Sequence, residues 1–325
     1  MKLRRLPQLL RWSQRRRICG ACFADPWRAS LLLTFLTKNP FQLQCVHGLT
    51  HPFEWADHPL WDWLSSHQAV RVGMSDTGDL LIRQDKHPTF ALRPGTSDGE
   101  MFRDIVIEDE YQLATLPERL HTVLDVGANI GLFGCLLLER ADKVFLVEPD
   151  PDNVLQIKKN LALHKKKNAT VLQMAVSGES NQTVDFFSHK RKKCCNTLLP
   201  GSFKPCDSDA IQVKQVKTIS LRDLLQWTGE NTVDLLKCDV EGAEYDIVAA
   251  AAKDGSLAKF SAILMEVHVR NKDGLAAADT LLEQIRQSGF SVQRLDSKPG
   301  IKQNKNAGKA LGFNIFCRAS TPAGE

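Results

Sequence analysis

The sequence has 325 residues, of which 43% are hydrophobic and 25% are charged. This composition is that of a globular chain with a sizeable core, and it excludes disordered and collagen-like classes. The net charge of +4 is uneven, because residues 1–30 contain eight Lys or Arg and one Asp and the rest of the chain therefore carries −3. Since the basic balance belongs to one terminal segment, we expect no nucleic-acid partner.

The nine cysteines are scattered and lack the paired spacings of a zinc site. We therefore expect reduced thiols and a cytoplasmic location. No apolar run approaches the ~20 residues that span a membrane. Residues 1–17 fit either a basic amphipathic helix at the inner face of a membrane or a solvated helix.

The chain is predicted to have three parts. Residues 1–68 are helical in tendency, with a cluster of aromatic residues expected to dock onto the core. Residues 69–117 contain alternating stretches typical of a small antiparallel β-region, followed by a helix over Asp98–Glu110 that begins with a capping box of Ser97 and Glu100. Residues 118–325 alternate strands and helices, which predicts a three-layer α/β sandwich.

The central stretch is residues 122–150, TVLDVGANIGLFGCLLLERADKVFLVEPD. It has the pattern of a buried strand, a glycine-rich turn, a helix over Leu132–Arg140 and a second strand that ends at Glu148. A carboxylate at the carboxyl end of that strand can accept hydrogen bonds from both hydroxyls of a ribose. The stretch therefore predicts a nucleoside-binding β-α-β unit.

The turn is not a dinucleotide fingerprint, because Asn129 and Leu132 occupy positions where G-x-G-x-x-G requires glycine. A phosphate loop is also absent from the sequence, since no Gly-Lys-Ser/Thr follows. The order D-x-G-x-N-x-G instead suits a ligand without phosphate at the turn, such as S-adenosylmethionine (SAM). Turn amides and polar side chains would hold its amino-acid end.

Further strands are predicted at 171–176, 183–188, 212–218, 235–238, 262–267, 291–295 and 313–318. The last two suit a hairpin at a sheet edge, and the connecting segment 296–312 is either a lid or a simple connection. Pro151–His164 is predicted as a helix, and Ser220 as the N-cap of another over residues 220–228.

Polar groups recur where the later strands end. Asp239 follows one strand, Glu241 lies in the next turn, and Glu266 and His268 end the following strand. Crowded carboxylates can share a proton or bind a cation, and an imidazole is the natural proton acceptor near neutral pH. We therefore predict a reaction centre at this edge.

The motifs LDVGANIGLF, FLVEPDPDN, AVSG, TISLRDLL, DLLKCDVEGAEYDIV and ILMEVHV occur in this order. Together they resemble the FkbM family of SAM-dependent methyltransferases, over roughly residues 97–318. The resemblance implies a Rossmann-like class I methyltransferase fold with a seven-stranded, mostly parallel sheet whose last strand is antiparallel. It also implies a hydroxyl of a sugar, glycan or secondary metabolite as the methyl acceptor.

By this resemblance, the methionine part of SAM would be held at the glycine-rich turn and its ribose by Glu148. Residues 174–176 would flank the adenine. Asp239 would face the methyl-transfer centre, with Glu241 and His268 on the acceptor side, and His268 or Asp239 would be the base. The predicted cofactor residues are Asp125, Gly127, Asn129, Gly131, Glu148, Met174, Ala175 and Val176, and the predicted catalytic residues are Asp239, Glu241 and His268.

Two other functional classes are compatible with these residues: a non-catalytic scaffold that keeps the fold, and a nicotinamide-dependent oxidoreductase. No metal is predicted as a cofactor, although a divalent cation held by Asp239, Glu241 and His268 is a variant of the mechanism. The unusual loop Cys194-Cys195-Asn196-Thr197 leaves the acceptor contacts open.

Overall fold

The computed structural model describes residues 19–25, 27, 29, 41–44, 50–53, 70–84, 87–199, 210–269, 273–295 and 311–320. The chain divides into two compact units. The first contains residues 1–108, 159–165 and 191–194, and the second contains residues 109–158, 166–190 and 195–325. The predicted membrane-surface helix, the aromatic cluster around Trp55–Trp63 and the candidate lid at 296–310 lie outside the described residues.

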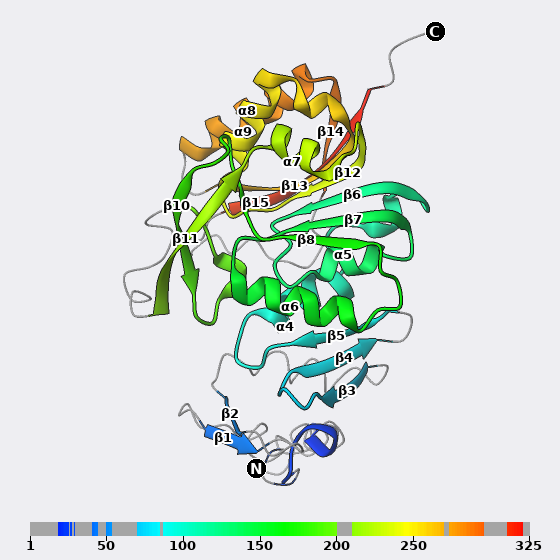
Figure 1. Ribbon diagram of the computed structural model, residues 1–325, viewed down its shortest axis with the longest axis vertical. Coiled ribbons are helices and arrows are strands. Elements are labelled where there is room, and N and C mark those ends of the chain that lie inside the picture. The colour runs from blue at the N-terminus through cyan, green and yellow to red at the C-terminus, as the bar shows by residue number, and fades with distance from the viewer. Residues whose placement is uncertain are drawn as a thin grey trace, which may run out of the picture. The chain divides into compact units, whose positions relative to one another are not determined.

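The second unit is built on a seven-stranded sheet with the order β14-β15-β13-β12-β6-β7-β8 (Figure 1). The β13, β12, β6, β7 and β8 neighbours pair in parallel, whereas β15 is antiparallel to both β13 and β14. The predicted fold class is thus confirmed, including the antiparallel last strand. The strands are β6 (Leu120–Val126), β7 (Ala141–Val147), β8 (Ala169–Leu172), β12 (Val233–Cys238), β13 (Phe260–Val269), β14 (Phe290–Leu295) and β15 (Leu311–Ala319).

Helices cover both faces of this sheet because its strands are apolar on both sides (Figure 1). One face packs against α7 (Leu221–Thr228), α8 (Glu244–Asp254) and α9 (Asp273–Gln287) through a continuous apolar core. The other face lies against α5 (Leu132–Leu137) and the start of α6 (Pro151–Ala162). The parallel strands thus all direct their carboxyl ends toward one edge, where polar groups gather.

The predicted third strand over 171–176 is two strands in the structure. β8 ends at Leu172 in the large sheet, and β9 (Ala175–Val176) pairs with β11 (Ile211–Ile219) in a separate sheet of order β10-β11-β9. β10 (Thr183–His189) pairs antiparallel with β11. The chain changes sheets at Gln173 and Met174, and this change places residues 174–176 beside the carboxyl end of β8.

The first unit contains the predicted antiparallel β-region, formed by β3 (Val70–Met74), β4 (Leu80–Gln84) and β5 (Thr89–Leu92). The helix predicted over Asp98–Glu110 is instead a short α-helix, α4 (Asp98–Met101), that continues as a π-helix over Phe102–Ile107. The shorter elements elsewhere are β1 (Phe41–Gln44), β2 (Thr50–Phe53) and the 3-10 turns Leu113–Thr115, Lys193–Cys195 and Ser256–Lys259.

The predicted capping box of Ser97 and Glu100 does not form. Ser97 has an α-like backbone (φ −74°, ψ 2°) rather than the extended backbone of a capping residue, and its side chain caps no helix amide. Its Oγ accepts a hydrogen bond from the amide of Cys194. Ser220, in contrast, is extended (φ −77°, ψ 160°), and its side chain caps α7 through the amide of Asp223, as predicted.

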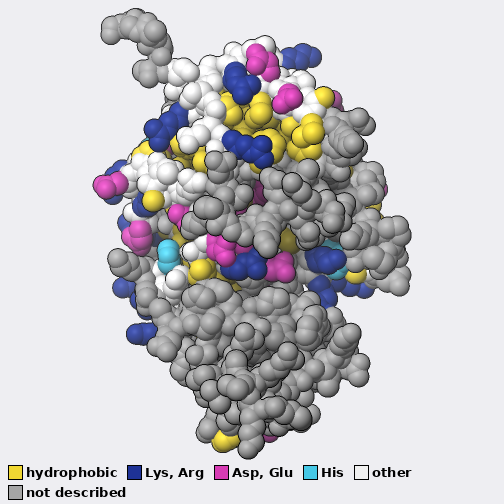
Figure 2. All heavy atoms as spheres, turned by 180° about the vertical axis from the view of Figure 1, so that it is seen from behind, with side chains coloured by type: hydrophobic (Ala, Val, Ile, Leu, Met, Phe, Trp, Pro, Cys, Tyr) yellow, Lys and Arg dark blue, Asp and Glu magenta, His cyan; other side chains and the backbone are white. Residues whose placement is uncertain are grey.

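A helix long and apolar enough to cross a membrane does not occur in the described part of the chain. On the face of the molecule shown in Figure 2, the Lys/Arg and Asp/Glu side chains of described residues are interspersed.

Candidate active site

The glycine-rich turn lies directly against the end of the neighbouring strand β12. Gly127 has a φ of +71°, and a Cβ atom built on it would collide with the carbonyl oxygen of Asp239. Gly131 has a φ of +79° and begins helix α5. Asn129 also adopts positive φ (52°), and its Oδ1 atom is buried without a hydrogen-bond partner in the described structure. The turn thus brings backbone amides and an unused acceptor to the strand-end edge.

Asp125 lies at the base of this turn and is fully buried. Its Oδ2 accepts a hydrogen bond from the amide of Gly134, and its Oδ1 lies 3.4 Å from Nζ of Lys237. Burial raises the pKa of Asp125, although Lys237 opposes the shift. Lys237 also donates to the carbonyl oxygen of Gly127 and lies 3.6 Å from Asp239. Burial lowers the pKa of Lys237, but the charges of Asp125 and Asp239 outweigh burial and raise it.

Glu148 is 4% exposed and follows β7, as predicted. Its Oε2 accepts the amide of Asn129, and its Oε1 accepts the amide of Asp150 and the side chain of Asn153. Burial raises the pKa of Glu148 to about 7 although these hydrogen bonds oppose the shift. Glu148 is therefore fixed to the turn that contains Asn129, and its Oε2 keeps lone-pair capacity for a ligand hydroxyl.

The residues predicted to flank adenine occupy the crossing between the two sheets. Ala175 and Val176 are buried in β9, and Met174 packs against the core of the second unit. The backbone amide of Glu148 donates to the carbonyl oxygen of Leu172 at the end of β8. Residues 174–176 therefore begin two residues after Leu172, which contacts Glu148, the residue predicted to bind the ribose.

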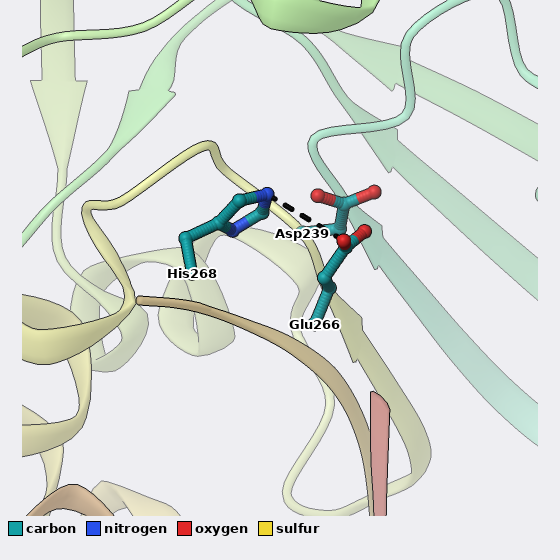
Figure 3. Close-up of side chains that lie close together, drawn as sticks. All are labelled: Asp239, Glu266 and His268. Carbon is teal, nitrogen blue, oxygen red and sulfur yellow. Dashed lines mark ion pairs between the residues drawn. The ribbon is translucent and has the colours of Figure 1, made fainter. Parts of the chain in front are cut away.

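A second cluster forms where β12 and β13 end. Asp239 follows β12, while Glu266 and His268 are alternate residues of β13 and so project from the same face of that strand. One ligand atom from each of these three side chains lies within 4.8 Å of the others. Figure 3 shows the three side chains directed toward one another.

His268 is buried among carboxylates. Its Nδ1 lies 2.9 Å from Oε1 of Glu244, and its Nε2 lies 3.4 Å from Glu241 and 3.7 Å from Glu266. Burial lowers the pKa of His268, but the hydrogen bonds and charges of Glu241 and Glu244 raise it to about 12. Burial also raises the pKa of Glu241, and burial together with the charge of Asp239 raises that of Glu266 well above its ordinary value. In this arrangement the imidazole is a cation at neutral pH.

Asp239 has different partners. Its Oδ2 accepts a hydrogen bond from the hydroxyl of Tyr111, and Lys237 is its nearest cation. Tyr111 is buried and packs edge-on against Phe133, and burial together with the charge of Asp239 raises the pKa of its hydroxyl well above the ordinary value. The hydroxyl therefore remains a proton donor and holds the Asp239 carboxylate in place.

The structure brings the predicted site residues to one edge of the sheet in two groups. Asp125, Gly127, Asn129, Gly131 and Glu148 surround the turn, and Asp239, Glu241 and His268 lie at the neighbouring strand ends. Sequence reasoning gave no role to Lys237, Glu244 or Tyr111, and named Glu266 only as part of the strand end. A single lysine in the apolar strand LLKC was a usable signal, because a buried lysine requires an anionic partner.

The residues at the turn fit SAM. The unused Oδ1 of Asn129 is an acceptor for an ammonium group, and Oε2 of Glu148 keeps capacity for a ligand hydroxyl. A seven-stranded sheet with this order, an antiparallel β15 and such a turn defines a class I SAM-dependent methyltransferase.

Comparison with known families identifies the family within this class of methyltransferases. Residues 125–292, just over half of the chain, match the Methyltransferase FkbM domain. The chain therefore belongs to the FkbM family of SAM-dependent methyltransferases, and SAM is its cofactor. This result confirms the family expected from the motifs, and it sets aside the oxidoreductase and the non-catalytic scaffold.

Several curated proteins are similar to the chain. Methyltransferase 1 of Beauveria bassiana is 24% identical over 58% of this chain and 80% of its own length, and methyltransferase sdnD of Sordaria araneosa is 25% identical over 52% and 74%. The AMB antimetabolite synthetase AmbE of Pseudomonas aeruginosa is 26% identical over 59% of this chain. The chain spans only a tenth of that synthetase.

Solved structures with a similar fold include a precorrin-6y C5,15-methyltransferase from Geobacter metallireducens and an rRNA methylase from Streptococcus thermophilus. The first is 12% identical, covers 66% of this chain and 85% of its own, and has a TM-score of 0.35. The second is 10% identical, covers 66% and 95%, and has a TM-score of 0.39.

Proposed function

We propose that this methyltransferase transfers the methyl group of SAM to a hydroxyl of a sugar, a glycan or a secondary metabolite. The observation that carries the proposal is the position of Asp239. Its backbone touches the cofactor turn at Gly127, and its side chain joins the cluster with Glu266 and His268. A carboxylate between a methyl donor and a polar cluster is suited to an acceptor that must lose a proton.

Of the two candidate bases, Asp239 is the better one. His268 is held as a cation by Glu241 and Glu244 at neutral pH, so it has no lone pair for a proton. Asp239 is fixed by the Tyr111 hydroxyl and retains its second oxygen for the acceptor proton. We assign the base to Asp239 and give His268 the task of orienting Glu241 and Glu266.

The remaining contribution to catalysis is the positioning of the methyl donor relative to the acceptor. Bound SAM supplies an electrophilic methyl group on a sulfonium. The turn around Gly127 and the fixed carboxylate of Glu148 hold the donor in one orientation, and the buried Lys237 keeps Asp125 and Asp239 in register across β6 and β12. Fixed geometry of this kind contributes most when two reactants must meet in line.

The similar proteins support a small acceptor. The segment shared with AmbE belongs to a protein named as an antimetabolite synthetase, and the two fungal relatives are named methyltransferases. A nucleic-acid acceptor is disfavoured by the charge of residues 31–325, which is −3.

The test is a methyl-transfer assay on a panel of sugar, glycan and polyketide alcohols. Asp239→Asn keeps the shape of the side chain but removes the base, so we expect turnover to fall by about 10²–10⁴-fold. SAM affinity should stay close to that of the parent. Unchanged turnover in Asp239→Asn would exclude Asp239 as the base. Methyl transfer to amines but not to alcohols would overturn the proposed acceptor class.

A further inference from the structure

We propose that Asp239, Glu266 and His268 form a binding site for a divalent metal cation at the acceptor side of the strand-end edge. The three ligand atoms lie within 4.8 Å of one another and converge on one point from two neighbouring strands (Figure 3). A divalent cation holds oxygen and nitrogen ligands at about 2.0–2.6 Å, so two ligands of one ion lie roughly 3–5 Å apart. The spacing of the three atoms therefore matches a single ion.

The orientation of His268 is a second observation, separate from the ligand spacing, that supports the metal site. Glu244 is fully buried at the start of α8, where its Oε1 accepts the amide of Val240 and lies 2.9 Å from Nδ1 of His268. A carboxylate that accepts these bonds requires the imidazole proton on Nδ1, so Nε2 is the nitrogen presented to Glu266. A buried carboxylate behind the ring is the usual support of a metal-binding histidine, because it fixes the tautomer and raises the basicity of the free nitrogen.

The distances around Nε2 agree with a shared ion. Glu241 and Glu266 lie 3.4 and 3.7 Å from this nitrogen. A charge-assisted hydrogen bond between such groups is typically about 2.7–2.9 Å long. The Glu266 carboxylate and the ring thus face each other across a gap that is too wide for a strong direct bond and suited to an ion between them.

The charged side chains around the cluster also favour a bound cation. Asp125 and Asp239 pair with Lys237, and Glu241, Glu244 and Glu266 lie within 4 Å of His268. Lys237 already divides its charge between Asp125 and Asp239. A divalent cation bound at His268 would be paired with the carboxylates that surround this imidazole. The two carboxylates and one imidazole favour Mn²⁺ or Mg²⁺ over a soft, thiolate-seeking metal.

This inference rests on the proposed function in one respect, the role of the cation. An acceptor hydroxyl that becomes a further ligand would be held beside Asp239, and its pKa would fall on coordination. A carboxylate is a weak base toward a free alcohol, so a lowered acceptor pKa explains how Asp239 suffices. Binding of the cation itself requires neither SAM nor an acceptor, and it can be measured alone.

The experiment is a titration of the metal-stripped, full-length protein with MnCl₂, followed by the loss of the free Mn²⁺ signal in electron paramagnetic resonance. We expect one site per chain. Glu266→Gln and His268→Gln each remove a ligand and should weaken Mn²⁺ binding by about 100-fold or more, while Glu244→Gln, which alters only the support, should weaken it by about 10–100-fold. Glu179→Gln, which alters an exposed carboxylate outside the cluster, is the matched control and should leave the affinity unchanged.

Glu266 is partly exposed, so its Gln variant should fold, and a melting curve for each variant verifies this. Tight Mn²⁺ binding by Glu266→Gln, or no binding by the parent at millimolar Mn²⁺, would overturn the site. Binding of methylammonium in place of Mn²⁺ would assign the cluster to a cationic acceptor group instead. Methyl transfer to alcohols that persists in EDTA would refute the cation's role and leave the proposed function intact. Mn²⁺ binding without transfer to any alcohol would support the metal site and refute the proposed acceptor class.

Discussion

The two halves of the strand-end edge are built differently. Around the turn after β6, every carboxylate is tied to the backbone: Asp125 accepts the amide of Gly134, and Glu148 accepts the amides of Asn129 and Asp150. At the ends of β12 and β13, the contacts are between side chains: Asp239 contacts Tyr111 and Lys237, and His268 contacts Glu241, Glu244 and Glu266. The first half thus holds its carboxylates with backbone amides, and the second gathers its carboxylates around one imidazole and one lysine.

This difference agrees with the proposed roles, in which the first half binds SAM and the second binds the acceptor. A cofactor that is always the same can be met by fixed amides and carboxylates, which cost no reorganisation on binding. The groups of a reaction centre change charge during turnover, and in the proposed acceptor half Asp239 and His268 contact other side chains rather than backbone amides. Lys237 joins the halves, because it contacts Asp125, Asp239 and the carbonyl oxygen of Gly127.

The largest effect is therefore expected at Lys237. Lys237→Met keeps the length of the side chain but leaves two carboxylates without their cation, one of them fully buried, so the free energy of unfolding should fall by about 3–5 kcal/mol. Lys143→Met is the control, because Lys143 pairs with Glu230 at the surface and its loss should cost no more than about 1 kcal/mol. Urea denaturation measures both. Equal losses in the two variants would show that Lys237 does not link the halves.

The next effect concerns the contact between the turn and β12. Gly127→Ala places a Cβ against the Asp239 carbonyl, at a φ of +71°. Overpacking of this kind typically costs about 1–3 kcal/mol, and it should also reduce SAM affinity by separating the halves. Gly229→Ala is matched in backbone, with a φ of +73°, but has open space around it. It should show only the smaller cost of the backbone conformation, and similar melting temperatures for the two variants would contradict the close approach.

The smallest effect is a pH dependence of SAM binding. Because burial raises the pKa of Glu148 to about 7, its carboxylate is mostly ionised at pH 8 and mostly protonated at pH 6. Ionised Glu148 is the better acceptor for hydroxyls, so SAM affinity should fall by up to about tenfold as the pH drops across this range. Titration calorimetry at several pH values measures the slope. Glu148→Gln should bind more weakly and lose this slope, and an unchanged slope in the variant would assign the titration to another group.

The sequence was sufficient for the fold and for placing the glycine-rich turn and Glu148 at one edge of the sheet. The alternation of apolar strands and helices, the turn D-x-G-x-N-x-G and the position of Glu148 are local patterns, and the structure reproduces each of them. The misplaced elements depended on non-local contacts. β8 and β9 separate because Ala175 and Val176 pair with β11, and Ser97 fails as a cap because its hydroxyl bonds to Cys194.

The residues of the proposed acceptor half could be located in part from the sequence. Asp239, Glu241 and His268 could be placed at strand ends from the sequence, since parallel strands align their carboxyl ends. The partners of these residues could not be placed, because Tyr111 is 128 residues from Asp239 in sequence and Glu244 reaches His268 from the first turn of α8. The choice between the two bases depends on these partners, and so it required the structure.

We propose that one half of the strand-end edge binds SAM and that the other half binds the acceptor. Titration calorimetry with SAM tests it most directly, on the parent, Glu148→Ala and Asp239→Asn. We expect micromolar binding to the parent, loss of binding in Glu148→Ala and near-parental binding in Asp239→Asn. Unaltered SAM binding by Glu148→Ala, together with its loss in Asp239→Asn, would contradict the division.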